Sequence, residues 1–303
     1  MFPQKPMLTV IGSYPVNIDR MRLMDSYFTA QQMSCWQPAI SKAVNDMVKA
    51  GVKLVSDGQT RDPFMTIFTR GLSGCRVREQ TEVIHPVEFH KAITLSDLEF
   101  ARSILPKDTN LLGLIVAPFT LSKSVINQYY HDDKELAFAF AEALQQEAKA
   151  IEPVVDMISV DEPFFANDLP EYASELIDLV LEGICCPTRL HACGDVSKKV
   201  SSLLDLPVDI LSHEFMATPS LFDGFKEFPN EQKKICLGCV RADQDRVESV
   251  NEIRKQIQKA KMVFGSRLAQ VAPDCGLRLL PRENAFQKLV HLNQALQEEY
   301  HEG

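Results

Sequence analysis

The chain has 303 residues, a formal net charge of −9 and a pI near 5.3. Hydrophobic residues make up 45% of it and charged residues 24%, a composition typical of a globular protein with a large core. The acidic balance excludes nucleic acid and anionic membranes as expected partners, and no apolar run approaches the roughly 20 residues of a membrane span. Because the first residues also lack the apolar run of a signal peptide, we expect a cytoplasmic protein.

Eight short β-rich runs recur along the chain, and segments with helical periodicity lie between them. The runs cover residues 8–13, 52–58, 111–118, 156–163, 187–194, 208–215, 234–240 and 268–276. Apolar residues repeat at helical spacing over residues 41–50, 133–151, 172–182 and 249–263. Alternation of this kind predicts parallel strands joined by right-handed crossovers.

Eight such strands predict an α/β fold, a single catalytic (β/α)8 TIM barrel domain over residues 1–303. The alternative, an open doubly wound sheet, lacks its glycine-rich dinucleotide motif here. The intervals 59–110 and 118–155 are longer than one helix needs. We expect them to supply extra loops or helices over the carboxyl-terminal mouth of the barrel.

Residues that can bind a metal collect where the predicted strands end, which is where barrel active sites lie. His191 and Cys193 are two residues apart on an extended run, so both face the same side, while Glu214 and Cys275 end two later strands. One imidazole, two thiolates and one carboxylate suit tetrahedral zinc, which lowers the pKa of a bound thiol from about 8.5 into the physiological range. The alternative is that the His-x-Cys pair only packs in a strand.

The other cysteines and histidines are expected to be structural, and the eight cysteines to be reduced. Cys236 and Cys239 fall in a predicted strand, where residues three apart face opposite sides, so core packing is expected. His213 points away from the site if Glu214 points into it. The remaining histidines are expected in helices or loops: His85, His90, His131, His291 and His301.

The chain resembles the catalytic carboxyl-terminal barrel of cobalamin-independent methionine synthase, and above all the short archaeal-type core enzymes that consist of that barrel alone. Five segments carry the resemblance: Ile11-Gly12-Ser13, Val160-Asp161-Glu162-Pro163, His191-Ala192-Cys193, Glu214 and Pro273-Asp274-Cys275-Gly276-Leu277.

The resemblance implies which residues bind metal and substrate. It implies zinc on the four predicted ligands: His191, Cys193, Glu214 and Cys275. It also implies that Ser13 and Asp161 bind homocysteine, with backbone contacts from Ile11 and Gly12. A strand-end aspartate can pair with the ammonium group and so orient the amino acid for catalysis. A serine hydroxyl and backbone N–H groups can bind the carboxylate.

Three positions depart from the family's pattern. A glutamate that helps to hold the amino group is replaced within residues 56–59, where Asp57 or Gln59 takes its place. The segment 117–124 after the third strand lacks the tryptophan on which the family stacks a pterin. Asp243 occupies the position of a histidine thought to assist protonation of the folate nitrogen, which makes it a candidate catalytic residue.

The resemblance implies a zinc-dependent methyltransferase that forms methionine from homocysteine. Because the stacking tryptophan and the histidine are both missing, we predict a methylcorrinoid donor, delivered by a corrinoid protein, since reduced cobalt leaves without a proton. One alternative is methylation of the thiol of coenzyme M, against which Glu214, the turn at 11–13 and Asp161 argue because coenzyme M has no ammonium group. The others are a methyltetrahydrofolate-dependent homocysteine methyltransferase and a non-catalytic zinc-binding scaffold.

Overall fold

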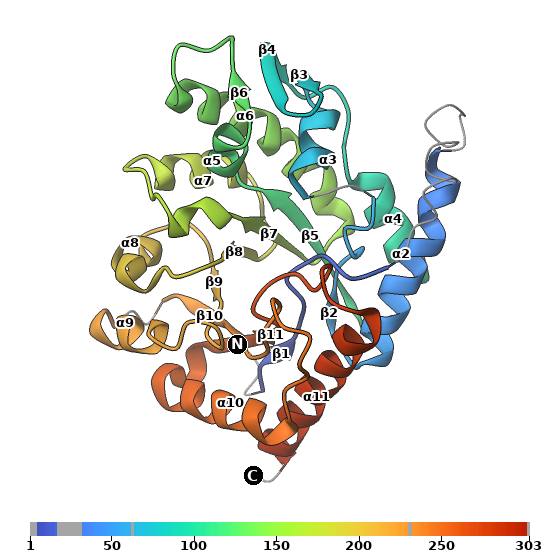
Figure 1. The fold of residues 1–303 in the computed structure, drawn as a ribbon, viewed down its shortest axis with the longest axis vertical. Coiled ribbons are helices and arrows are strands. Elements are labelled where there is room, and N and C mark those ends of the chain that lie inside the picture. Colours follow the sequence, from blue (N-terminus) through green and yellow to red (C-terminus); the bar gives the residue numbers. More distant parts are fainter. Residues whose placement is uncertain (1–4, 17–31, 62–63, 230–231, 302–303) are drawn as a thin grey trace.

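The computed structural model describes residues 5–16, 32–61, 64–229 and 232–301. Eight strands pair in the order β1-β11-β10-β9-β8-β7-β5-β2, and all of the pairs between them are parallel. A further parallel bridge, between Thr9 and Leu54, links the two ends of this order. The sheet thus curls into a barrel with helices around it (Figure 1). The predicted TIM barrel is confirmed.

The barrel strands are shorter than the predicted runs. They are β1 (Met7–Leu8), β2 (Leu54–Val55), β5 (Asn110–Val116), β7 (Met157–Asp161), β8 (Thr188–Ala192), β9 (Ile210–His213), β10 (Lys234–Gly238) and β11 (Leu268–Ala272). Each predicted run coincides with one strand but extends past its carboxyl end by two to five residues. The residues beyond the strands form the turns of the mouth, where the polar side chains lie.

Helices fill the intervals between the strands. They are α2 (Gln32–Lys49), α3 (Phe64–Gly71), α4 (Leu95–Ile104), α5 (Pro118–Lys123), α6 (Asp133–Ile151), α7 (Ala173–Leu181), α8 (Val200–Leu204), α9 (Leu221–Glu227), α10 (Val250–Phe264) and α11 (Arg282–His301). Short 3-10 helices are η1 (Glu152–Val154), η2 (Pro163–Ala166), η3 (Ser197–Lys199) and η4 (Gly265–Arg267). Of the described helices, none combines the length and the apolar character needed to cross a membrane.

Local capping explains why two of the predicted helices begin where they do. The side chain of Asp132 accepts a hydrogen bond from the Glu135 backbone at the start of α6. Ser249 and Glu252 form a reciprocal capping box at the start of α10. The predictions for 133–151, 172–182 and 249–263 are therefore confirmed to within a residue, whereas the predicted helix 41–50 is only the second half of α2.

The alternation of side chains along the strands divides the core into two parts. Outward-facing residues such as Val160, Leu190 and Leu211 belong to the main core beneath the helices. Inward-facing Met157 and Ile210 belong to a smaller cluster inside the barrel. Further along the same strands the inward-facing residues become polar, and this polarity continues into the mouth.

A second sheet occupies part of the long intervals, where we expected loops or helices. It joins β3 (Ser73–Val77), β4 (Thr81–Glu88) and β6 (Ile126–Asn127) in the order β3-β4-β6. The first pair is antiparallel and the second parallel. His85 lies in β4, so its predicted placement in a helix or loop is wrong. These strands are mostly half-exposed and carry charged residues, which is why they lack the apolar signature of the barrel strands.

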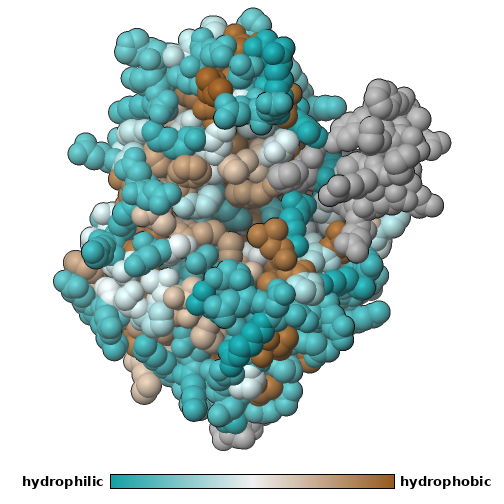
Figure 2. Space-filling view, viewed as in Figure 1, coloured by the Kyte–Doolittle hydropathy of each residue, from teal (hydrophilic) through white to brown (hydrophobic). Residues whose placement is uncertain are grey.

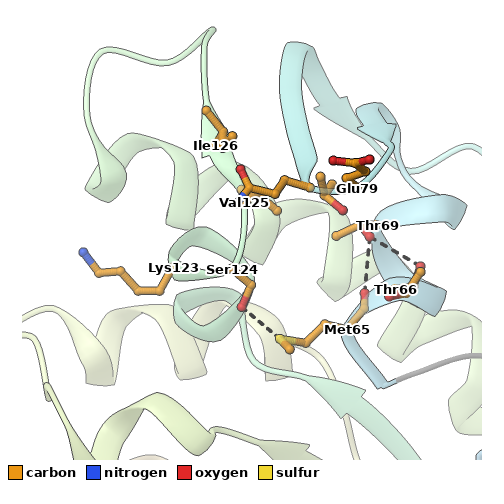
Figure 3. A pocket seen from close by; sticks show the side chains of 10 residues that line it. Met65, Thr66, Thr69, Glu79, Lys123, Ser124, Val125 and Ile126 are labelled. Carbon is orange, nitrogen blue, oxygen red and sulfur yellow. Dashed lines mark hydrogen bonds between the residues drawn. The ribbon is translucent and has the colours of Figure 1, made fainter.

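A cleft of about 390 Å³ lies between this small sheet, α3 and α5 (Figure 3). Within it, Ser124 Oγ donates a hydrogen bond of 2.8 Å to Met65 Sδ. None of the predicted site residues lines this cleft. The candidate chemistry lies instead at the mouth of the barrel.

Glu147 on α6 anchors the segment that leads from β4 to α4. Its fully buried carboxylate accepts hydrogen bonds from Ile93 N at 2.7 Å, Thr94 N at 2.8 Å and Thr94 Oγ1 at 2.7 Å. Replacing Glu147 by Gln keeps the volume but turns one acceptor oxygen into a donor. We expect the free energy of unfolding to fall by about 1–3 kcal/mol, measured by urea denaturation. The control Glu142→Gln, exposed on the same helix, should change it by less than about 0.5 kcal/mol; equal losses in the two variants would contradict the anchoring role.

Candidate functional site

The four predicted metal ligands come together at the barrel mouth. His191 is on β8 and Cys193 follows it, while Glu214 follows β9 and Cys275 follows β11. One ligand atom from each residue lies within 4.8 Å of those of all the others. His191 Nε2 is 3.1 Å from Cys193 Sγ, which is 3.2 Å from Cys275 Sγ. Strand ends far apart in the sequence thus converge on one point.

A neighbouring strand orients the imidazole of His191. Its Nδ1 is 3.1 Å from Ser212 Oγ on β9. A proton on Nδ1, donated to this hydroxyl, leaves the Nε2 lone pair facing the sulfurs, which is the tautomer that a metal ligand needs. Burial, aided by the charge of Arg189, also holds the pKa of His191 well below its usual value. The imidazole is therefore neutral and able to bind a metal.

The remaining donors are crowded in a way that fits a divalent cation. The hydrogen bond with Cys275, together with burial, raises the pKa of Cys193 well above its usual value. Burial also raises the pKa of Glu214. The pKa values of Cys193 and Glu214 are thus both raised, so ionising either group is costly, and a central cation removes that penalty. The donor set of one nitrogen, two sulfurs and one oxygen fits zinc.

A cavity of about 350 Å³ opens beside these ligands. Its lining includes the sulfur ligands Cys193 and Cys275 as well as His191. Five of the predicted substrate-binding residues line the same cavity: Ile11, Gly12, Ser13, Gln59 and Asp161. A metal-binding end and a polar end capable of holding a small molecule therefore share one space.

Asp161 is the last residue of β7, and its carboxyl group lies at the polar end of the cavity. It is buried, and Ser159 Oγ donates a hydrogen bond of 2.8 Å to its Oδ1. Burial raises the pKa of Asp161 to about 7, while the Arg189 charge and the Ser159 hydrogen bond act in the opposite direction. A carboxyl in such a place favours a cationic partner, because a bound cation compensates the cost of ionising it.

The turn of Ile11-Gly12-Ser13 forms the opposite wall. Ser56 Oγ donates a 2.6 Å hydrogen bond to Gly12 O, and Leu277 N donates one of 2.8 Å to Ser13 O. A side chain at Gly276 would overlap the Ser13 hydroxyl, so glycine there lets the Cys275 loop approach this turn. The turn is thereby attached to the metal-binding loop.

Of the two residues predicted to replace the family's glutamate, Gln59 faces the cavity and Asp57 does not line it. Asp57 Oδ1 instead accepts a hydrogen bond of 3.0 Å from Gln59 N. Gln59 has a φ of 45°, in the left-handed region, and this bond helps to hold it there. Burial raises the pKa of Asp57 to about 6. Asp57 therefore supports Gln59 and does not reach the cavity itself.

The geometry argues against the predicted catalytic role of Asp243, which does not line the cavity. Arg241 donates two hydrogen bonds to its carboxylate, of 2.7 and 2.5 Å, and the Asp243 side chain is 64% exposed. The bond from Arg241 lowers the pKa of Asp243. Asp243 is thus ionised at neutral pH and is unsuited to donate a proton.

Three of the residues predicted to be structural lie away from the cavity. Cys236 and Cys239 are fully buried. His213 Nδ1 lies 3.2 Å from Ala192 O, and its ring packs against Phe215 and Phe225, on the opposite side of β9 from the ligands. These three residues take no part in the cavity.

Several residues of the site were not predicted from the sequence. Phe64, Arg278 and Leu279 line the cavity, and so do Pro163 and Gly276, which the sequence indicated only as parts of the family segments. In Figure 2, residues of high or intermediate hydropathy are frequent near the middle of the face shown, and hydrophilic residues are more frequent around them. Arg278 is three residues after Cys275, so its closeness in the sequence to a predicted ligand could have indicated that it lies at the site. Phe64 lies in a long interval without a readable pattern, and nothing in the sequence indicates its position.

Asp274 links the loops that carry two of the predicted metal ligands, Glu214 and Cys275. Its carboxylate accepts hydrogen bonds from Met216 N at 3.1 Å and Ala217 N at 2.7 Å. A side chain at Gly238 would collide with Asp274 and with the carbonyl of His213. The loop that carries Cys275 is therefore fixed to the loop that carries Glu214.

This combination of fold and site defines a class of protein, the α/β-barrel enzymes with a sulfur-rich group of potential metal ligands at the mouth. Residues 7–298 match the family model described as cobalamin-independent synthase, catalytic domain. The chain is 33% identical to a methionine synthase of Methanocaldococcus jannaschii, over 95% of this chain and 97% of that protein. It is also 33% identical to a methionine synthase of Methanothermobacter marburgensis, over 96% and 99%. The chain belongs to the cobalamin-independent synthase family and corresponds to the short archaeal-type form.

Solved structures agree on the fold. A B12-independent methionine synthase from Shewanella sp. W3-18-1, in complex with selenomethionine, superposes with a TM-score of 0.82 at 20% identity, covering 98% of both chains. A methyltransferase from Methanosarcina mazei gives a TM-score of 0.70 at 18% identity, covering 98% of this chain and 94% of the other. The family's description as cobalamin-independent lends no support to the predicted corrinoid donor.

If the four ligands hold zinc, the purified protein should contain about one zinc ion per chain, and Cys275→Ser should contain less than about a tenth of that. The reason is that a hydroxyl cannot replace the thiolate as a soft anionic ligand. Metal analysis by mass spectrometry, with competition by a chromophoric chelator, measures both quantities. The control Cys185→Ser changes an exposed cysteine and should keep the full zinc content. Full zinc in Cys275→Ser would show that the metal lies elsewhere.

Proposed function

We propose that this protein is a single-domain, zinc-dependent homocysteine methyltransferase that forms methionine. One observation carries the proposal: three of the four predicted metal ligands, His191, Cys193 and Cys275, line the same small cavity as the buried acid Asp161. A thiol amino acid has matching groups, a sulfur at one end and an ammonium at the other. Membership of the cobalamin-independent synthase family supports the same activity.

The chain's own residues bind and orient the amino acid. Asp161 pairs with its ammonium group, and the Ser13 hydroxyl with the N–H groups of the turn binds its carboxylate. The side chain of homocysteine then extends toward His191, Cys193 and Cys275. Apolar neighbours such as Phe64 and Pro163 reduce the access of water to the sulfur.

Zinc, when bound, lowers the pKa of a coordinated thiol and keeps the sulfur nucleophilic. In the overall reaction the thiol loses its proton, a bond forms between sulfur and the methyl carbon, and the bond between that carbon and the donor breaks. The protein's contribution is to hold sulfur and methyl in line and to exclude water.

Coenzyme M is the weaker acceptor candidate. Its sulfonate would have to occupy the space beside Asp161, whose charge repels an anion, and it offers no ammonium to compensate the burial of that acid. The cavity therefore favours homocysteine.

For the donor, we propose a methyl compound whose leaving group departs without a proton, as in a methylcorrinoid carried by a partner protein. The supporting observation is that Asp243 is ion-paired and outside the cavity, so it supplies no acid for a folate nitrogen. The family is described as cobalamin-independent, which gives the corrinoid no support. One observation favours folate instead: Phe64 lines the cavity with an aromatic side chain, although the tryptophan on which the family stacks a pterin is missing. Efficient turnover with methyltetrahydrofolate in the absence of corrinoid would overturn the corrinoid proposal.

Asp161→Asn should raise the KM for homocysteine by about 30- to 100-fold, because the amide cannot form the charge-assisted bond to the ammonium group. Methionine formation is followed with methylcobalamin and with methyltetrahydrofolate in parallel assays. Asp178→Asn, exposed on α7, is the matched control and should leave KM unchanged. An unchanged KM in Asp161→Asn, or faster turnover with coenzyme M than with homocysteine, would remove the amino-acid pocket from the proposal.

The pH dependence of product binding gives a separate prediction. Methionine carries the ammonium group but no thiol, so its affinity reports Asp161 without the titration of a substrate sulfur. Because the pKa of Asp161 is raised to about 7, the carboxyl becomes protonated as the pH falls through that value. In zinc-free protein, the dissociation constant of methionine should rise below about pH 7, approaching tenfold per pH unit. Calorimetry from about pH 5.5 to about pH 8.5 should give a nearly flat profile for Asp161→Asn.

A further inference from the structure

A fully buried arginine lies inside the barrel, beneath the cavity. Arg189 is on β8, two residues before His191, and its side chain is 0% exposed. Each hydrogen bond found for its guanidinium within the described chain goes to a neutral acceptor. A buried cation without a direct ion-pair partner is costly, and an apolar side chain could fill the same space at less cost. Filling the barrel therefore does not explain this residue.

One arm of the guanidinium leads to Asp161. Arg189 Nε donates a hydrogen bond of 3.1 Å to Ser159 Oγ, and that hydroxyl donates one of 2.8 Å to Asp161 Oδ1. Ser159 and Arg189 are paired positions on β7 and β8, so the barrel ladder itself sets this contact. The charge of Arg189 also counteracts the burial of Asp161.

The other arms lead to the opposite wall of the cavity. Nη2 donates to Val10 O at 3.1 Å and to Ile11 O at 3.4 Å, at the point where the chain leaves β1 and enters the turn at 11–13. Nη1 donates to Gln270 Oε1 on β11 at 3.2 Å. The planar fork of arginine fixes the directions of these bonds together. One side chain thus connects both walls of the polar end from below.

We propose that Arg189 is a positioning residue of the amino-acid pocket, holding Asp161 and the turn at 11–13 at the separation that the ammonium and carboxylate of one α-amino acid require. This inference rests on the proposed function, since it takes an amino-acid thiol as the acceptor. Arg189 does not touch the substrate. It acts through Ser159 on one side and through the carbonyls of Val10 and Ile11 on the other.

The test compares homocysteine with propane-1-thiol, which has the same carbon–sulfur segment but neither charged group. The ratio of kcat/KM for the two thiols measures recognition of the amino-acid end, independently of the donor and of zinc. In Arg189→Met this ratio should fall by about 10- to 100-fold, through a higher KM for homocysteine. Zinc content and the rate with propane-1-thiol should stay within about threefold of the wild type. Calorimetry with methionine should show a matching loss of affinity.

Three further variants separate positioning from general stability. Arg189→Lys keeps the charge but loses the fork, so its ratio should be intermediate. Ser159→Ala cuts only the arm to Asp161 and should lower the ratio by about 3- to 10-fold. Arg102→Met is the matched control, because Arg102 on α4 bonds to Val154 O and Asp156 and contacts no part of the cavity lining. It should leave the ratio unchanged.

The outcomes are distinct. If the wild type prefers homocysteine but Arg189→Met and Ser159→Ala keep the wild-type ratio, Arg189 is not a positioning residue. If Arg189→Met does not fold, Ser159→Ala, a smaller change, decides the question alone. A wild type that shows no preference for homocysteine over propane-1-thiol would overturn the proposed function instead, whatever the variants do.

Discussion

The parallel register of β7, β8 and β9 is the constraint on which the site depends. Asp161 is paired with His191 across the first two strands, and His191 with Ser212 across the next two. Paired residues on parallel strands point the same way, so the acid, the imidazole and its orienting hydroxyl share one level of the barrel interior. A slip of one residue in β8 would turn His191 outward and leave the other two without it. The metal end and the polar end are thus brought together by the backbone ladder.

The charges of the mouth follow from this arrangement. Burial raises the pKa of Asp161, Glu162 and Asp274 to about 7 each, and it also raises the pKa of Glu214. Burial opposes the ionisation of each of these acids, because it removes the solvation of the charged form. A divalent metal at the sulfur end and an ammonium group at the Asp161 end are two cations of suitable charge. Each one that binds lowers the cost of ionising the acids around it.

Much of the barrel and of the metal site could be predicted from the sequence, for a physical reason. Strands buried on both faces form continuous apolar runs, and the residues that end them must lie at one mouth. His191, Cys193, Glu214 and Cys275 could therefore be grouped from their positions at the ends of such runs. The sheet of β3, β4 and β6 lacks that signal because its strands are half-exposed and carry charges.

The missing parts of the site depend on tertiary contacts. Phe64 reaches the cavity only through the course of a long interval, and Asp243 is held outside the cavity in an ion pair with Arg241. Arg189 was open to prediction. A charged residue in an otherwise apolar run, two positions before His191, has to face the barrel interior with it. A barrel interior is ordinarily filled by branched apolar residues. An inward-facing arginine at that position therefore indicates a role in holding the residues of the mouth in place.

The two ends of the cavity are held in different ways, and this difference bears on how the site can work. Asp161 and the turn at 11–13 are tied through Arg189 to the strands, which are the most rigid part of the fold. Glu214 and Cys275 lie beyond their strands and are tied to each other through Asp274. The proposed amino-acid end is therefore anchored to the barrel, while two of the predicted metal ligands belong to a joined pair of loops. If a substrate thiol displaces Glu214 from a metal, the Asp274 bonds need not break, because they bind the backbone after Glu214 and leave its side chain able to turn.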